Sequence, residues 1–432
     1  MRVRSAGAVL AVAAAVLAIT SPARAEQALS PAEQRMAWAA KLIAAHPDDP
    51  QPHVDLGWAL ARRARETGDP AHYATAQEEA TRALALAPGN FEARKLEVWL
   101  LLGRHEFGPA LVAAKALNQQ APDDVMVYGF LADANAELGE YKAAEDAVQW
   151  MLDMRPGNLS GLTRAAYLRE IFGDLDGAIE LYTASFNRMA LTEVEDRAWI
   201  LSQVGHLYLS KGSTAEAGQA LEEALALVPA YHYALGHLAR VRLAEKRSGE
   251  AVKLLRQLCE AAPHAENVYA LAEALHQAGS PEARAAYAEF ERKALAESAT
   301  RDNANRELVF YYVDRRPQGA DARRIADIER AARHDVHTLD ASAWALSAAG
   351  DHQKARIEIE QALAVGTRDA VMLYHAGVIA SRLQDVAAAQ RFLMQSLDVN
   401  PVSPVADEAR AALGALSNTA RSAHRIAAGV AR

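Results

Sequence analysis

The sequence has very little cysteine, few aromatic residues and no excess of positive charge. Cys259 is the single cysteine among 432 residues, which excludes an internal disulfide and any zinc or iron–sulfur site built from several thiolates. Aromatic residues make up only 6% of a chain that is 51% hydrophobic, which favours stacked helices packed through small residues over one deep core. The net charge of −9 makes the chain a poor nucleic-acid binder. We therefore expect no nucleic-acid partner.

Sequence motifs for catalysis and cofactor binding are also missing. No GxGxxG or Walker-type string occurs, and His105-Glu106 is not followed by the second histidine of a zinc-protease HExxH helix. His334 and His337 flank an aspartate, but they straddle the boundary between two predicted helices. No acid–base pair or nucleophile stands in a recognisable constellation. We expect no metal, no cofactor and no enzymatic activity.

Residues 1–25 have the pattern of a secretory signal peptide. Arg2 and Arg4 form a basic start, residues 6–19 are uncharged and apolar, and small residues precede Ala25. A membrane-spanning helix needs about 20 apolar residues, and neither this run nor any later one is long enough. We predict cleavage after Ala25, a periplasmic or secreted mature protein, and no stable membrane insertion.

Proline recurs at a fixed spacing after amphipathic stretches rich in Ala and Leu. Pro88, Pro122 and Pro156 are each 34 residues apart, and so are Pro229 and Pro263. Because proline cannot continue a helix, this period predicts a helix–turn–helix unit that is repeated along the chain. The period is longer near residues 65–72 and 186–197, where we expect lengthened loops or helices.

Small residues recur at fixed places within each unit. Ala132 and Gly205 lie in the first predicted helix, and Ala144 and Ala217 lie early in the second, where they allow the two helices to approach closely. This pattern resembles the tetratricopeptide repeat family, and segments such as 231–241 are similar to those of exported bacterial members without an assigned activity. The resemblance implies an all-α, right-handed superhelical solenoid of about 10 helix pairs.

The same period sets the expected domain organisation. After the signal peptide, the solenoid covers residues 26–418, with a half-repeat at 31–47, repeats at 51–401 and a capping helix at 404–418. Residues 419–432 have no expected packing partner, and we predict a flexible tail there.

The family resemblance also implies a binding groove, because the first helices of such repeats line the concave surface. Tyr, Trp and Arg are frequent anchors for bound peptides. Packing of the same rings against neighbouring helices is the alternative, and it is equally open for Trp199, Trp344 and Tyr374. The candidate groove residues are Asp133, Tyr167, Trp199, His206, Tyr233, Arg240, Phe310, Trp344 and Tyr374.

From these features we predict a non-catalytic scaffold or adaptor in the bacterial cell envelope. Its partner would be a protein, either an extended peptide segment or a component of an envelope complex. The alternative is a periplasmic module that binds a peptide or an oligosaccharide. The two differ in whether the mature chain captures a specific protein or responds to a small ligand.

Overall fold

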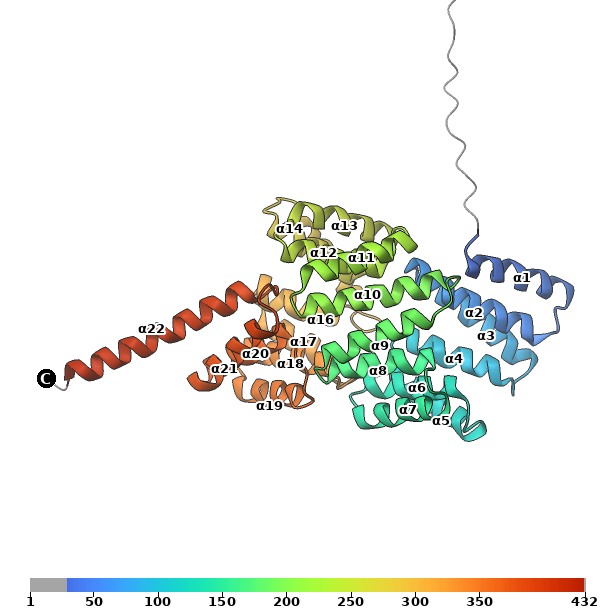
Figure 1. The fold of residues 1–432 in the computed structure, drawn as a ribbon, viewed down its shortest axis with the longest axis horizontal. Helices are drawn as coiled ribbons and strands as arrows, with labels where there is room; N and C mark the ends of the chain where they lie inside the picture. Colours follow the sequence, from blue (N-terminus) through green and yellow to red (C-terminus); the bar gives the residue numbers. More distant parts are fainter. Residues whose placement is uncertain (1–28, 431–432) are drawn as a thin grey trace, which may run out of the picture.

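The computed structural model describes residues 29–430, which fold into α-helices with no strand among them. The helix α1 (Pro31–Ala45) is followed by ten helix pairs and by α22 (Ala406–Val430). This arrangement confirms the all-α repeat solenoid (Figure 1). The pairs are α2 (Pro50–Thr67) with α3 (Ala71–Leu86), α4 (Phe91–Gly103) with α5 (Phe107–Gln120), α6 (Val125–Glu137) with α7 (Tyr141–Met154), α8 (Leu159–Ile171) with α9 (Leu175–Arg188), α10 (Val194–Ser210) with α11 (Thr214–Leu227), α12 (His232–Ala244) with α13 (Ser248–Ala261), α14 (Ala265–Gln277) with α15 (Ala283–Glu297), α16 (Asn305–Phe310, extended by the π-helical turn η1, Tyr311–Arg315) with α17 (Gly319–Arg330), α18 (Val336–Ala348) with α19 (His352–Leu363), and α20 (Ala370–Arg382) with α21 (Val386–Val399).

Helix ends and helix contacts follow the local sequence. Two residues after Pro122, the Asp124 side chain accepts the backbone N–H of Val127 at 3.0 Å and caps α6. A Cβ atom at Gly205 in α10 would lie 2.5 Å from Leu221 in α11, so this position has no room for a side chain. The repeated proline and small-residue positions therefore explain both the helix boundaries and the close pairing.

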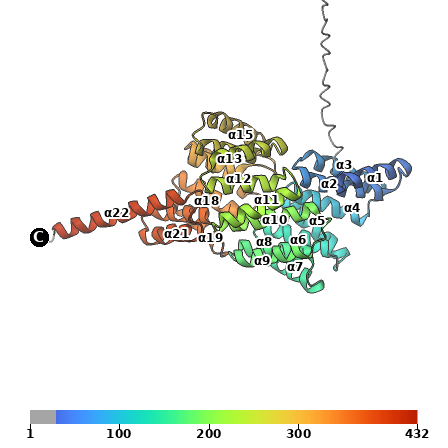
Figure 2. The same ribbon diagram turned by 45° about the horizontal axis from the view of Figure 1, so that its top comes forward.

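The predicted boundaries at the two ends of the chain can be compared with the structure only at the C-terminal end. The predicted signal peptide, residues 1–25, lies outside the described residues. Helix α22 runs to Val430, past the predicted end of the capping helix at 418 and into the predicted tail. It projects away from the body of the solenoid in both views (Figures 1 and 2). Between residues 29 and 430, no helix is both long and apolar enough to cross a membrane.

Successive turns of the superhelix touch each other through residues nearly 200 positions apart. Thr367 Oγ1 donates to the carbonyl of Ile171 at 2.6 Å, across 196 positions. Asn400 Nδ2 donates to the carbonyl of Leu209 at 2.8 Å, across 191 positions. Two further contacts of this kind complete what we call the seam. The four seam contacts are Gly68 with His264, Tyr141 with Val336, Ile171 with Thr367, and Leu209 with Asn400.

Glycine is required at the turns that form the seam. Gly139 and Gly173 have φ values of +80° and +79°, a left-handed conformation that strains other residues. A Cβ atom at Gly139 would lie 2.7 Å from the carbonyl oxygen of His334, and one at Gly173 would lie 2.3 Å from that of Gly366. The same glycines thus end a helix and allow the next superhelical turn to approach.

The two irregular places in the repeat meet in space. They correspond to long first helices, with 18 residues in α2 and 17 in α10. Arg62 of α2 contacts Asp196 of α10 at 2.8 Å, and Arg65 contacts Glu195 at 3.2 Å. Tyr231 donates to the buried Glu195 at 2.6 Å. The additional residues therefore add an ionic contact between distant repeats.

Candidate functional site

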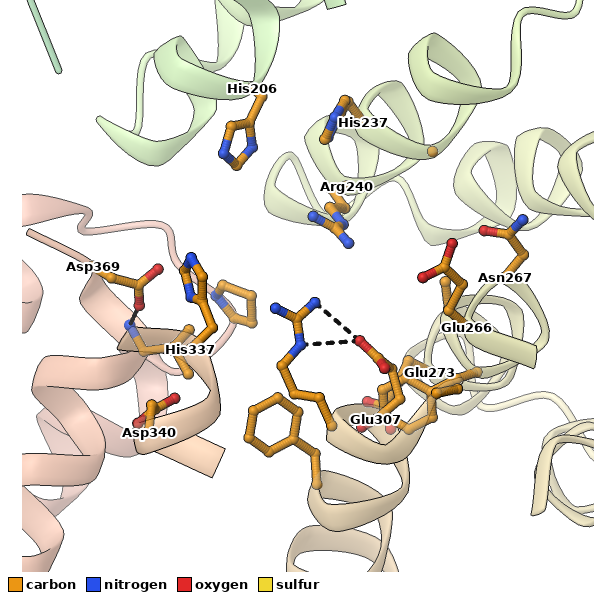
Figure 3. Close-up of a pocket in the computed structure, with 18 of the residues that line it drawn as sticks. His206, His237, Arg240, Glu266, Asn267, Glu273, Glu307, His337, Asp340 and Asp369 are labelled. Carbon is orange, nitrogen blue, oxygen red and sulfur yellow. Dashed lines mark hydrogen bonds and ion pairs between the residues drawn. The ribbon is translucent and has the colours of Figure 1, made fainter. Parts of the chain in front are cut away.

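The closed superhelix surrounds a cavity of about 2090 Å³. Small-molecule pockets usually measure about 300–1,000 Å³, so this space is large enough for a chain segment. Its wall is formed mainly by the first helices of successive pairs, from α8 to α20, together with residues of the seam. Figure 3 shows side chains from several of these helices pointing toward a common space.

The lining is unusually rich in histidine and also contains seven Tyr, Phe or Trp side chains. Eight of the 14 histidines of the chain line the cavity as the structure describes it. Sequence reasoning selected only His206 from this group, because the other positions do not share one place in the repeat. The eight are His105, His206, His232, His237, His264, His276, His337 and His375.

Seven of the nine predicted groove residues lie together in the cavity wall. The other two are engaged elsewhere. Asp133 on α6 accepts a hydrogen bond from Arg164 Nε at 2.7 Å, and Trp199 on α10 packs edge-to-face on Tyr182 with ring centroids 5.9 Å apart. A binding role for any of the nine stays a prediction. The seven that line the cavity are Tyr167, His206, Tyr233, Arg240, Phe310, Trp344 and Tyr374.

Trp344 forms part of the wall itself. Its side chain is only 4% exposed, its ring stacks on His375 with centroids 4.2 Å apart, and its Nε1 donates to Asp314 at 2.9 Å. Tyr374 lies beside it with a half-buried ring. The sequence left two interpretations open for Trp344, binding in the groove and packing against neighbouring helices. Most of the Trp344 side chain packs against its neighbours.

A buried histidine–aspartate contact lies next to that tryptophan. His375 Nδ1 is 2.7 Å from Asp340 Oδ1, and both side chains are buried. Burial disfavours the imidazolium, but the charges of Asp340 and Asp314 outweigh it and raise the pKa of His375. The pair gives this side of the cavity a fixed polar structure.

Glu137 stands where the cavity wall meets the seam. Tyr167 Oη donates to Glu137 Oε1 at 2.9 Å. Burial and, to a smaller extent, the nearby charge of Asp335 together raise the pKa of Glu137 to about 7. This carboxyl group therefore titrates near neutral pH.

The single cysteine and possible groups of metal-binding side chains are the remaining candidates for chemistry. Burial raises the pKa of the Cys259 thiol to about 11, which leaves it protonated at neutral pH. Within the described part of the chain, no group of three or more His, Cys, Asp or Glu side chains is placed to hold a metal ion. The arrangement is suited to binding through charge, hydrogen bonds and aromatic surface.

Comparison with known proteins agrees with this architecture. Residues 208–275 match the tetratricopeptide repeat family model, whereas a search of curated protein sequences finds no match. A monomeric mutant of IFIT1 with m7Gppp-AAAA is 16% identical, covers 77% of this chain and 76% of its own, and has a TM-score of 0.51.

Two further solved structures are similar at lower scores. Yeast Tom70 is 13% identical, with 89% of this chain and 92% of Tom70 covered and a TM-score of 0.41. PilW, a type IV pilus biogenesis factor, is 14% identical, with 48% and 92% covered and a TM-score of 0.39. The matched segment and the ten helix pairs show a tetratricopeptide-like helical solenoid fold.

Proposed function

We propose that this protein is a non-catalytic scaffold of the cell envelope that holds an extended segment of a partner protein inside its central cavity. Tetratricopeptide-type folds are suited to protein–protein interaction. The size of the cavity, about 2090 Å³, is the observation that carries the proposal, because it exceeds what a single small ligand fills.

The side chains that line the cavity are suited to binding a polypeptide. Half-buried Tyr233, Phe310 and Tyr374 offer apolar surface at several places around the cavity. Histidines and charged groups between them can pair with the backbone and side chains of a bound segment. Placement in the envelope rests on the leader pattern of residues 1–25.

A blocking variant tests the proposal. Val378 lies on α20, is half-buried and lines the cavity, so Val378→Trp adds bulk to that space. Ile357 on α19 is 65% exposed and is not part of the lining, which makes Ile357→Trp the matched control. Both variants should keep the wild-type circular dichroism spectrum.

The experiment is a pull-down from envelope extract with residues 26–432 of each form as bait. We expect the wild-type chain and Ile357→Trp to capture the same partner, and Val378→Trp to lose it. Equal capture by all three forms would contradict binding in the cavity. A wild-type chain that captures no protein but gains thermal stability with peptides or oligosaccharides would instead support the ligand-binding alternative.

A further inference from the structure

Arg240 is a cavity-lining arginine without an acidic partner. Its side chain is open to the cavity and points toward the centre of the group drawn in Figure 3. No carboxylate of the described residues lies within ion-pairing distance of its guanidinium group. Five other arginines of the lining are ion-paired at 2.6 to 3.2 Å: Arg65 with Glu195, Arg104 with Glu106, Arg306 with Glu307, Arg315 with Glu273, and Arg410 with Asp407.

A second unsatisfied polar group lies on the same face of the same helix. His237 precedes Arg240 by three residues on α12, so the two side chains are neighbours on the helix surface. The Nδ1 atom of His237 is buried and has no hydrogen-bond partner. Its ring lies 5.0 Å from that of His206, which extends the group of nitrogen-bearing side chains to α10.

The charges around Arg240 leave its positive charge uncompensated. Burial lowers the pKa of Arg240, and the positive charge of Arg306 lowers it further. Glu307 is already engaged by Arg306, and Glu266 contributes only from beyond ion-pairing distance. A guanidinium that has a like charge nearby and no carboxylate in contact gains stability when an anion joins it.

We propose that Arg240 and His237 form the site that receives an anionic group, a carboxylate or a phosphate, of the segment bound in the cavity. This inference rests on the proposed function, and it specifies the chemistry of the ligand. Arg240 would bind the anion through two parallel N–H donors. His237 would hydrogen-bond the same group, and Arg306 would add charge from across the cavity.

Small anions test the site without knowledge of the partner. Calorimetric titration of the full mature chain with pyrophosphate forms the phosphate arm, and titration with succinate forms the carboxylate arm. We expect Arg240→Gln to weaken binding by about 10-fold or more, and Arg240→Lys to weaken it less. Arg242→Gln is the control, because Arg242 lies on the same helix but outside the cavity lining and pairs with Glu222 and Glu245.

The two titrations distinguish between a phosphate and a carboxylate ligand. Arg240-dependent binding of only one probe identifies the phosphate or the carboxylate as the favoured group, and binding of both supports their shared chemistry. No binding of either probe, or equal binding by wild type and Arg240→Gln, would overturn the inference.

Partner capture separates this inference from the proposed function. If Arg240→Gln retains the partner while Val378→Trp loses it, the scaffold proposal stands and the anion site is wrong. If Val378→Trp retains the partner, the scaffold proposal itself fails, whatever the titrations show.

Discussion

Replacement of Gly173 by alanine tests whether the seam stabilises the superhelix. Gly173 has a φ of +79°, and alanine in this conformation costs about 1–2 kcal/mol. The new Cβ atom would also lie 2.3 Å from the carbonyl oxygen of Gly366, whereas ordinary contacts begin at 3.4 Å. The facing backbone must therefore move by about 1 Å, which disrupts the 2.6 Å hydrogen bond from Thr367 to Ile171. That bond contributes about 0.5–1.5 kcal/mol.

Gly350 provides the matched control. It occupies the turn between α18 and α19 with a φ of +88°, and a Cβ atom there would meet nothing within 4 Å. Gly350→Ala should cost only the backbone strain, about 1–2 kcal/mol. Gly173→Ala should cost about 1.5–3.5 kcal/mol once the seam contact is included.

Urea denaturation followed by far-UV circular dichroism measures this difference. Repeat arrays can lose cooperativity, so the midpoints of the two variants are compared directly. Small-angle X-ray scattering on the native proteins adds a second readout, since a weakened seam should increase the radius of gyration of Gly173→Ala alone. Equal midpoints and equal radii for the two variants would refute the reasoning.

Two further predictions concern Glu137, which accepts a hydrogen bond from the cavity residue Tyr167, and Trp344 in the cavity wall. The folded chain holds the pKa of Glu137 at about 7, above the value of roughly 4.3 in an unfolded chain. Between these two pH values the folded chain binds a proton at Glu137 that the unfolded chain has released. The free energy of unfolding therefore falls as the pH rises from about 4.3 to about 7, and the loss is complete above about pH 7. Glu137→Gln should be more stable than wild type near pH 8 and should lose that advantage near pH 5, as measured by urea midpoints at both pH values; an unchanged difference would contradict the assignment. Trp344 is 4% exposed and stacks on His375, so Trp344→Ala should lower the free energy of unfolding by about 3–5 kcal/mol. Wild-type stability of that variant would show that the ring serves the cavity alone.

The repeat architecture was readable from the sequence because its causes are local. Proline cannot continue a helix beyond its first turn, so Pro88, Pro122 and Pro156 follow helix ends. A residue such as Gly205 must be small because its own partner helix lies directly against it. Both effects act within one 34-residue unit, so they recur at a fixed period. The helix pairs and the two longer units could be predicted for this reason.

Only part of the candidate site could be predicted from the sequence. Repeat positions placed Tyr167, His206 and Arg240 on first helices, and all three line the cavity. The same reasoning also selected Asp133 and Trp199, which are engaged by neighbouring helices instead. A repeat position sets the direction of a side chain but not which neighbour occupies the space in front of it.

By itself, the sequence determined the helix pairs, their boundaries and the small residues that let each pair close, because these depend on contacts within one repeat. Only the tertiary structure decided that the superhelix closes through the seam, that eight histidines gather around one cavity, and that Arg240 faces it without an acidic partner. Those features join residues as far apart as Ile171 and Thr367. Small rotations between repeats accumulate to set such distances, and no single repeat encodes their sum.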